Sequence, residues 1–445
     1  MAFPVPYRMC MDILLTHTTA LETLRSARLR WRLDRRERCD ARVPDRAPSG
    51  EELRAFIAAT PELARASLPL GLLVTRDAPR SRTKLAHTHP SPAELPAGSA
   101  FEVAPGVLCV SPEHLPAVMA PSLTDLELAF LLSELLGLYA IAPDLENGMF
   151  QRREPLTTPE LVLTHLDALG SERGTDRVRR ALASACVQSG SPQETRLSMR
   201  LGLARMRGGY GFDVLAMNDP VAVQRVRDAM RPGVRKPDIL LRAPDGNGRG
   251  VAVEYDGGDH NSTEAHARDA ERHTELIALG IDEHIVTARQ YHDLDYMDGL
   301  AEIMRKTLGI SKPHLTRAQQ TRNRQLRQRL YKELELIDGV HWNGRGGGHA
   351  PPPLPTTSGT LFPSTRTASR RGSSRHPILK DGDLAVMCVP SRQIQGMDRE
   401  EPQVANYTRC HIAQFEERTQ PSRFSNVLIA GVVSRPSRMI AAPTP

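Results

Sequence analysis

Two short apolar segments, residues 238 to 242 (DILLR) and 251 to 256 (VAVEYD), are separated by the turn-forming sequence APDGNGRG. Such a connection between two apolar segments predicts an antiparallel hairpin of two strands. Alternate residues of a strand point to opposite faces, so Glu254 and Asp256 should share one face. The hairpin should bring Asp238, at the beginning of the first strand, close to both carboxylates.

Crowded carboxylates need a counter-charge. Two like charges about 4 Å apart repel by roughly 4 kcal/mol at an effective dielectric of about 20. Carboxylates without a nearby lysine or arginine therefore need a bound cation or a shared proton, and we expect that case here. Oxygen ligands suit Mg²⁺ or another hard divalent cation, which can polarise a phosphoryl oxygen and activate a coordinated water for attack on a phosphodiester.

The segments on either side of this hairpin also carry charged residues and histidine that could belong to the same site. Upstream, GSPQETRLSMRL predicts a helix with Glu194 in its first turn. After Asp256 the sequence GGDH ends at His260, and TEAHARDAERHTELIALG then predicts a helix that ends at Gly280. Arg268 and Arg272 are four residues apart on that helix and share a face that could meet phosphate. EHIVTA predicts a third strand, and YHDLDYMDGLAEIMRKTL predicts a closing helix.

In this order the elements resemble the very-short-patch-repair branch of the PD-(D/E)xK endonuclease superfamily over residues 190 to 310, about a quarter of the chain. The resemblance implies a restriction-endonuclease-like core, a mixed sheet flanked by helices, that binds Mg²⁺. It implies metal ligands at Asp238, Glu254 and Glu194, and catalytic roles for Asp238, Glu254, Asp256 and His260. Asp256 stands where the archetype has lysine, and His260 would be a general base or position water. Arg268, Asp269 and Arg272 match the following helix of that branch.

Each of these residues also has a simpler interpretation. Glu254 and Asp256 could lie on a solvated strand face, and His260 could be a turn or core histidine. Arg268 and Arg272 could belong to an ordinary surface helix, with Asp269 as an ion-pair partner of Arg272. Glu194 could be a first-turn carboxylate beside the helix dipole, because SPQE is similar to a capping box.

The rest of the chain divides by composition. Residues 1 to 150 predict a smaller α+β domain, with helical periodicity in LLTHTTALETLRSARLRW and EELRAFIAAT, a strand at VLCV, and a helix at SLTDLELAFLLSELL. Three short segments of it, LTHTTAL, GVLCVSPEHL and the Leu-rich helix, faintly resemble abortive-infection antitoxins of the AbiEi type, although an unrelated helical module fits equally. Residues 151 to 189 predict a helical connector in two segments, and residues 341 to 445 a disordered tail with the apolar islands LAVMCV and NVLIAGVV.

Residues 311 to 340 predict a basic helix that carries a run of arginines without an intervening acid. Such a helix suits contact with a phosphate backbone, and a solvated helix is the alternative. The formal net charge of +6, supplied almost entirely by arginine, favours an anionic partner. The expected nucleic-acid-binding residues are Arg268, Arg272, Arg322, Arg324 and Arg327.

Six scattered cysteines indicate neither a zinc site nor a disulfide framework, and no apolar run approaches the roughly 20 residues that span a bilayer. We therefore expect an α+β protein of the cytoplasm without a membrane partner. Its expected activity is metal-dependent hydrolysis of nucleic-acid phosphodiesters, most plausibly in DNA, in repair, restriction or phage defence. The alternative is a nucleic-acid-binding or antitoxin-like regulator on a nuclease scaffold that does not cleave.

Overall fold

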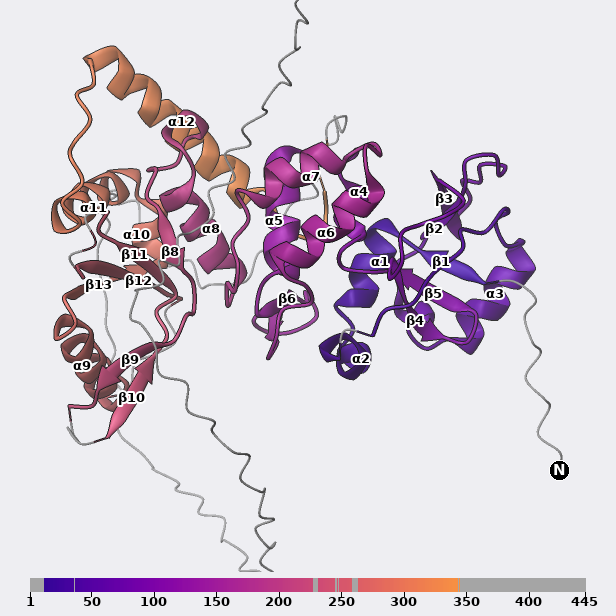
Figure 1. Cartoon of the computed structure of the whole chain (residues 1–445), viewed down its shortest axis with the longest axis horizontal. Helices are drawn as coiled ribbons and strands as arrows, with labels where there is room; N and C mark the ends of the chain where they lie inside the picture. Colours follow the sequence, from indigo (N-terminus) through magenta and orange to yellow (C-terminus); the bar gives the residue numbers. More distant parts are fainter. Residues whose placement is uncertain are drawn as a thin grey trace, which may run out of the picture. The chain divides into compact units, whose positions relative to one another are not determined.

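A computed structural model describes residues 12–35, 37–226, 231–244, 246, 248–257, 263–342 and 344 (Figure 1). Within these ranges, only the backbone of residues 30, 31, 215 and 263–269 is described. The protein is α+β, with mixed sheets flanked by helices. His260 and nearly all of the predicted tail, including LAVMCV and NVLIAGVV, lie outside the described residues. No helix in the described ranges is long and apolar enough to cross a membrane.

The N-terminal part contains a five-stranded mixed sheet in the order β3-β2-β1-β5-β4. Its strands are β1 (Ile13–Leu15), β2 (Leu70–Thr75), β3 (Ala86–Ser91), β4 (Ala100–Ala104) and β5 (Val107–Val110). The helices of this part are α1 (His17–Leu24), α2 (Arg30–Asp34) and α3 (Gly50–Ala59). The α+β prediction is thus confirmed, as is the strand at VLCV.

The prediction that LLTHTTAL begins as a helix is wrong for its first residues. β1 pairs with β2 on one side and with β5 on the other, so it lies inside the sheet, and Ile13, Leu14 and Leu15 are all buried. A strand covered on both faces has no alternation of polar and apolar residues, so periodicity does not separate it from a buried helix.

The middle of the chain is mostly helical. Its elements are α4 (Leu115–Met119), α5 (Asp125–Leu135), β6 (Tyr139–Ile141), β7 (Met149–Gln151), α6 (Pro159–Leu169) and α7 (Thr175–Leu182). α5 begins after Thr124, which forms a capping box with Glu127. The two predicted connector helices are α6 and α7, which the segment from Gly170 to Gly174 separates.

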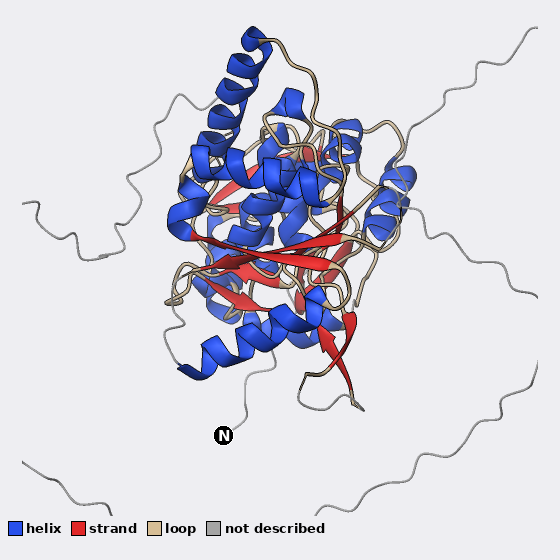
Figure 2. Cartoon of the chain, turned by 90° about the vertical axis from the view of Figure 1, so that its left-hand side faces the viewer, coloured by secondary structure: helices blue, strands red, loops and turns tan. Residues whose placement is uncertain are grey.

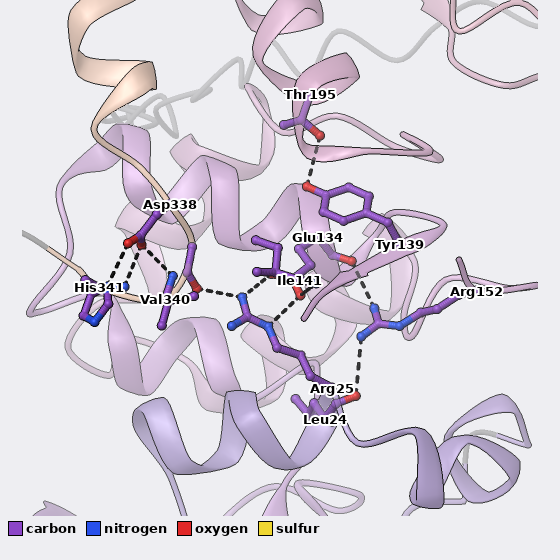
Figure 3. A network of polar contacts seen from close by, with 11 residues as sticks. Leu24, Arg25, Glu134, Tyr139, Ile141, Arg152, Thr195, Asp338, Val340 and His341 are labelled. Carbon is purple, nitrogen blue, oxygen red and sulfur yellow. Dashed lines mark hydrogen bonds and ion pairs between the residues drawn. The ribbon is translucent and has the colours of Figure 1, made fainter. Parts of the chain in front are cut away.

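A buried polar network connects the first helix with the last described residues (Figure 3). Arg25 donates to the carboxylate of Glu134 from Nε at 2.7 Å and from Nη2 at 2.5 Å. Nη2 of Arg25 also donates to the carbonyl of Gly339 at 2.7 Å. The hydroxyls of Tyr139 and Thr195 lie 3.1 Å apart in the same network. The predicted N-terminal domain, helical connector, central part and basic helix therefore all belong to one compact unit.

The central part is built on a four-stranded sheet in the order β13-β12-β11-β8. These strands are β8 (Val214–Ala216), β11 (Ile239–Arg242), β12 (Gly250–Asp256) and β13 (Ile281–Thr287). β11 is antiparallel to β8 and β12, whereas β12 is parallel to β13. The predicted hairpin is confirmed, with Ile239 opposite Val253. A separate two-stranded ribbon, β9 (Val221–Gln224) and β10 (Pro232–Arg235), was not predicted.

Helices cover both faces of this sheet, namely α8 (Pro192–Gly202), α9 (Thr263–Ile277), α10 (Ala288–His292) and α11 (Leu294–Thr307). Ile239 and Val253 belong to the main core, which also contains apolar residues of α8 and α11. Leu240 and Ala252 point to the opposite face and pack with Leu276 of α9. Figure 1 accordingly shows α9 on one side of the strands and α8 with α11 on the other, and Figure 2 shows the same layers after a quarter turn.

The predicted basic helix is α12 (Arg317–Glu335), which begins at a capping box between Thr316 and Gln319. It is not solvated on all sides, because Leu330 and Leu334 are buried against the core. A short helix, η3 (Arg205–Arg207), ends at Gly208, which has φ +90. A Cβ there would meet the backbone of α12 at Leu326, so only glycine allows this close approach.

Candidate active site

Asp238 and Glu254 are brought together by the pairing of β11 with β12. The backbone N–H of Asp238 donates to Oε1 of Glu254 at 3.2 Å. The backbone N–H of Tyr255 donates to Oδ2 of Asp238 at 2.8 Å. The carboxylates of Asp238 and Glu254 therefore lie close together, as the predicted hairpin requires. Asp256 follows two residues later as the last residue of β12 and is partly exposed.

Glu194 lies in the first turn of α8, close enough to Asp238 for the charge of Asp238 to raise its pKa. The side chain of Ser191, the residue before this helix, accepts a hydrogen bond from the Glu194 N–H at 3.1 Å. The side chain of Glu194 is buried, and Oε2 accepts from the Gly190 N–H at 2.7 Å and from Nδ2 of Asn218 at 2.8 Å. Glu194 is thus held in a fixed orientation and is not a solvated first-turn carboxylate. We call Glu194, Asp238 and Glu254 the carboxylate cluster.

Burial and mutual repulsion dominate the electrostatics of the cluster. Burial, followed by the charge of Asp238, raises the pKa of Glu254 to about 8 and that of Glu194 to about 7. Burial also raises the pKa of Asp238, against the hydrogen bond from the Tyr255 N–H, which lowers it. The cluster therefore retains protons at neutral pH unless a cation compensates its charge.

One basic side chain does reach the cluster, so the expectation of no nearby lysine or arginine is wrong. The guanidinium of Arg272 on α9 forms an ion pair with Glu254, and its Nε lies 3.1 Å from Oε1 of Glu283 on β13. The sequence analysis placed Arg272 on a phosphate-binding helix face but did not predict that this face turns toward the sheet. Arg272 lowers the pKa of Glu254 without overcoming the effects of burial and Asp238.

The donor set fits a hard divalent cation of modest protein coordination. In the described part of the chain, no group of three or more histidine, cysteine, aspartate or glutamate side chains is arranged to hold a metal ion. Asp238 and Glu254 nevertheless supply two carboxylates, and Mg²⁺ commonly takes one or two from the protein and completes its coordination with water and substrate phosphates. The excess of three carboxylates over one guanidinium favours such a cation.

The other predicted site residues are distributed more widely. His260 lies outside the described residues, and of Arg268 and Asp269 only the backbone within α9 is described. On α12, Arg322 is exposed. Arg324 forms ion pairs with Asp295 at 2.6 Å and Asp298 at 3.2 Å, and Arg327 pairs with Asp298 at 2.7 Å.

Two residues of the site escaped the sequence analysis. Asn218 holds Glu194 and has a positive φ of 51, which asparagine tolerates in tight turns. The turn-forming sequence around it, NDP, is the signal that marks its loop. Glu283 is the second partner of Arg272 and lies opposite Ala252 on the parallel strand β13, a pairing that only the strand order reveals.

Comparisons of the chain with family models, with curated proteins and with solved structures found no match. The functional interpretation therefore rests on the geometry and chemistry of the residues themselves.

Proposed function

We propose that the protein is a metal-dependent endonuclease that hydrolyses phosphodiester bonds of nucleic acid, with DNA as the first substrate to test. The observation that supports this most is the meeting of Asp238 and Glu254 from two neighbouring strands, with Glu194 close enough for the charge of Asp238 to raise its pKa. Largely buried carboxylates with raised pKa values and one basic partner are costly to maintain without a function.

The order of the central elements supports the proposal. α8, β8, β11, β12, α9 and β13 follow one another in a mixed sheet with helices on both faces, and the ribbon β9–β10 is inserted between β8 and β11. This is the arrangement that the resemblance to the PD-(D/E)xK superfamily leads one to expect, and we propose a restriction-endonuclease-like core on that basis.

In the proposed mechanism, Asp238 and Glu254 would hold Mg²⁺, which would supply Lewis-acid activation of the phosphoryl group and of a water. Glu194, whose pKa is raised to about 7, remains fixed by Gly190 and Asn218. Arg272 pairs with Glu254 and also with Glu283, so it would keep one carboxylate partner when Glu254 served as a metal ligand. Asp256 and His260 remain the candidates for assisting the attacking water.

The test is nicking of supercoiled plasmid DNA by the full-length chain with and without Mg²⁺. We expect Mg²⁺-dependent nicking that falls at least about 100-fold in Asp238→Asn and in Glu254→Gln. Asp213→Asn is the matched control, since it removes an exposed carboxylate of the same part of the chain and should nick normally. Equal nicking by Glu254→Gln and the wild-type protein would refute the assignment.

Two observations favour a second candidate, a nucleic-acid-binding or antitoxin-like regulator that does not cleave. Arg272 already compensates Glu254, and Asp256 stands where the archetypal nuclease has lysine. This candidate predicts salt-dependent DNA binding without nicking under Mg²⁺ or Mn²⁺. DNA binding alone does not distinguish the two candidates, whereas the nicking assay does.

A further inference from the structure

A cavity of about 470 Å³ lies between η3, α11 and the first turns of α12, apart from the carboxylate cluster. Basic residues dominate its lining, with six cations against the two acids Asp298 and Glu302. The cations are Arg205, Arg305, Lys312, Arg317, Arg324 and Arg327. None of them belongs to the carboxylate cluster.

Both acids of the cavity already form ion pairs with basic side chains of its lining. Asp298 pairs with Arg324 at 3.2 Å and with Arg327 at 2.7 Å, and Lys312 lies 2.9 Å from Glu302. Among the described residues, Arg205, Arg305 and Arg317 have no acidic partner. Three guanidinium groups therefore line one cavity without forming an ion pair with an acid of the described residues.

Arg305 is the most informative of the three, because only 6% of it is exposed. Its Nη2 donates to the carbonyl of Tyr210 at 2.6 Å, and its guanidinium carbon lies 4.8 Å from the centre of the Phe212 ring. Its Nη1 is buried and has no hydrogen-bond partner in the described part of the chain. A buried donor of a charged group that lacks an acceptor is costly, so an acceptor from outside the protein would stabilise it.

Like charges add to this cost. Burial lowers the pKa of Arg305, and the nearby charges of Arg205 and Arg327 lower it further, against the charge of Glu302, which raises it. The first turns of α12 also face the cavity through Arg317, Gln320 and Thr321, so the positive end of the helix dipole acts in the same direction.

We propose that this cavity is a binding site for a phosphate group, with Arg305 donating from Nη1 and with Arg205 and Arg317 completing the shell. A phosphate offers several acceptor oxygens and a compact negative charge, which match planar guanidinium donors. The group can come from a nucleic-acid strand or from a free phosphorylated compound. The inference does not depend on the carboxylate cluster being catalytic.

The test uses full-length protein without divalent cations, so that the carboxylate cluster cannot contribute a metal-bound phosphate. Binding of inorganic phosphate is followed by the ³¹P line width at constant ionic strength. We expect saturable binding that weakens about tenfold in Arg205→Gln and in Arg317→Gln, as loss of one charge-assisted hydrogen bond implies. Both residues are at least partly exposed, so the fold should tolerate these changes.

Arg329→Gln is the matched control, because Arg329 is also on α12 but pairs with Glu333 and does not line the cavity. It should bind phosphate as the wild-type protein does. No saturable binding, equal binding in Arg317→Gln and wild type, or an equal loss in Arg329→Gln would overturn the proposal, the last because it would indicate a diffuse charge effect.

A labelled DNA duplex identifies the source of the phosphate group. If the cavity holds a strand phosphate, inorganic phosphate competes with the duplex, and Arg317→Gln lowers the salt dependence of duplex binding by about one counterion. If it holds a free phosphorylated compound, Arg317→Gln loses phosphate binding but binds the duplex as Arg329→Gln does. Nicking in the plasmid assay is scored separately, so the two proposals can fail independently.

Discussion

Replacing Glu254 with glutamine should change how stability depends on pH. The folded state raises the pKa of Glu254 from its ordinary 4.5 to about 8, so between these values the folded protein binds more protons than the unfolded chain. Stability contributed by the protonated carboxyl is complete below about pH 4.5 and is lost as the pH rises toward 8. Each pH unit in this window costs about 1.4 kcal/mol for one such group.

From pH 5.5 to 7.5, Glu254 alone should therefore lower the free energy of unfolding of the wild-type protein by about 2 kcal/mol without divalent cations. Glu254→Gln cannot ionise, so its stability should fall less over the same range, and the difference between the two proteins should grow with pH. Urea unfolding of both proteins at four pH values, in the presence of a chelator, measures this difference.

Added Mg²⁺ gives the second half of the experiment. At ten times its dissociation constant a ligand of the folded state stabilises by about 1.4 kcal/mol, and this gain should appear at pH 7.5 in the wild-type protein but not in Glu254→Gln. Parallel pH profiles for the two proteins would refute the reasoning about the carboxylate cluster. A stabilisation by Mg²⁺ of the same size in both would refute the assignment of Glu254 as a ligand.

Two further substitutions test how the fold holds its parts. Glu134→Ala should lower the free energy of unfolding in urea by about 3 to 5 kcal/mol, because it leaves Arg25 buried without its carboxylate partner. Its control is Glu172→Ala, which breaks an exposed ion pair and should lower the free energy of unfolding by at most about 1 kcal/mol. Gly190→Ala should lower the free energy of unfolding by about 1 to 3 kcal/mol, because the new Cβ would lie 3.0 Å and 3.1 Å from the carboxylate oxygens of Glu194. Its control is Gly257→Ala, whose Cβ meets open space and should leave the free energy of unfolding unchanged. Equal costs within either pair would contradict the argument.

Local chemistry was sufficient to predict the hairpin of the candidate site. The turn-forming residues between β11 and β12 and the alternation in VAVEYD set the pairing, so the sequence alone places Asp238 beside Glu254. The helix end near Gly280 is equally predictable, because capping residues act through their own neighbours in sequence.

Features that depend on distant parts of the chain were not predictable in this way. Whether Arg272 faces solvent or the sheet is decided by how α9 packs, and its second partner Glu283 becomes visible only through the parallel pairing of β13 with β12. β1 was missed because both of its faces are covered by the fold. The sequence of α12 predicts a continuous row of exposed arginines, whereas in the structure acids of α11 form ion pairs with Arg324 and Arg327.

The hydrogen bond from Arg25 to the carbonyl of Gly339 ties the first helix to residues that follow the last one. Such a closure makes the protein difficult to dissect. A fragment ending at residue 310 would lack α12 and Gly339. Arg25 would then lose one of its hydrogen-bond acceptors, and the apolar surface that Leu330 and Leu334 cover would be exposed. A fragment beginning at residue 190 would lose Tyr139 from beside Thr195. Replacement of the central sheet alone by that of another chain would break the same contacts, so we expect such chimaeras to be less stable than the intact protein.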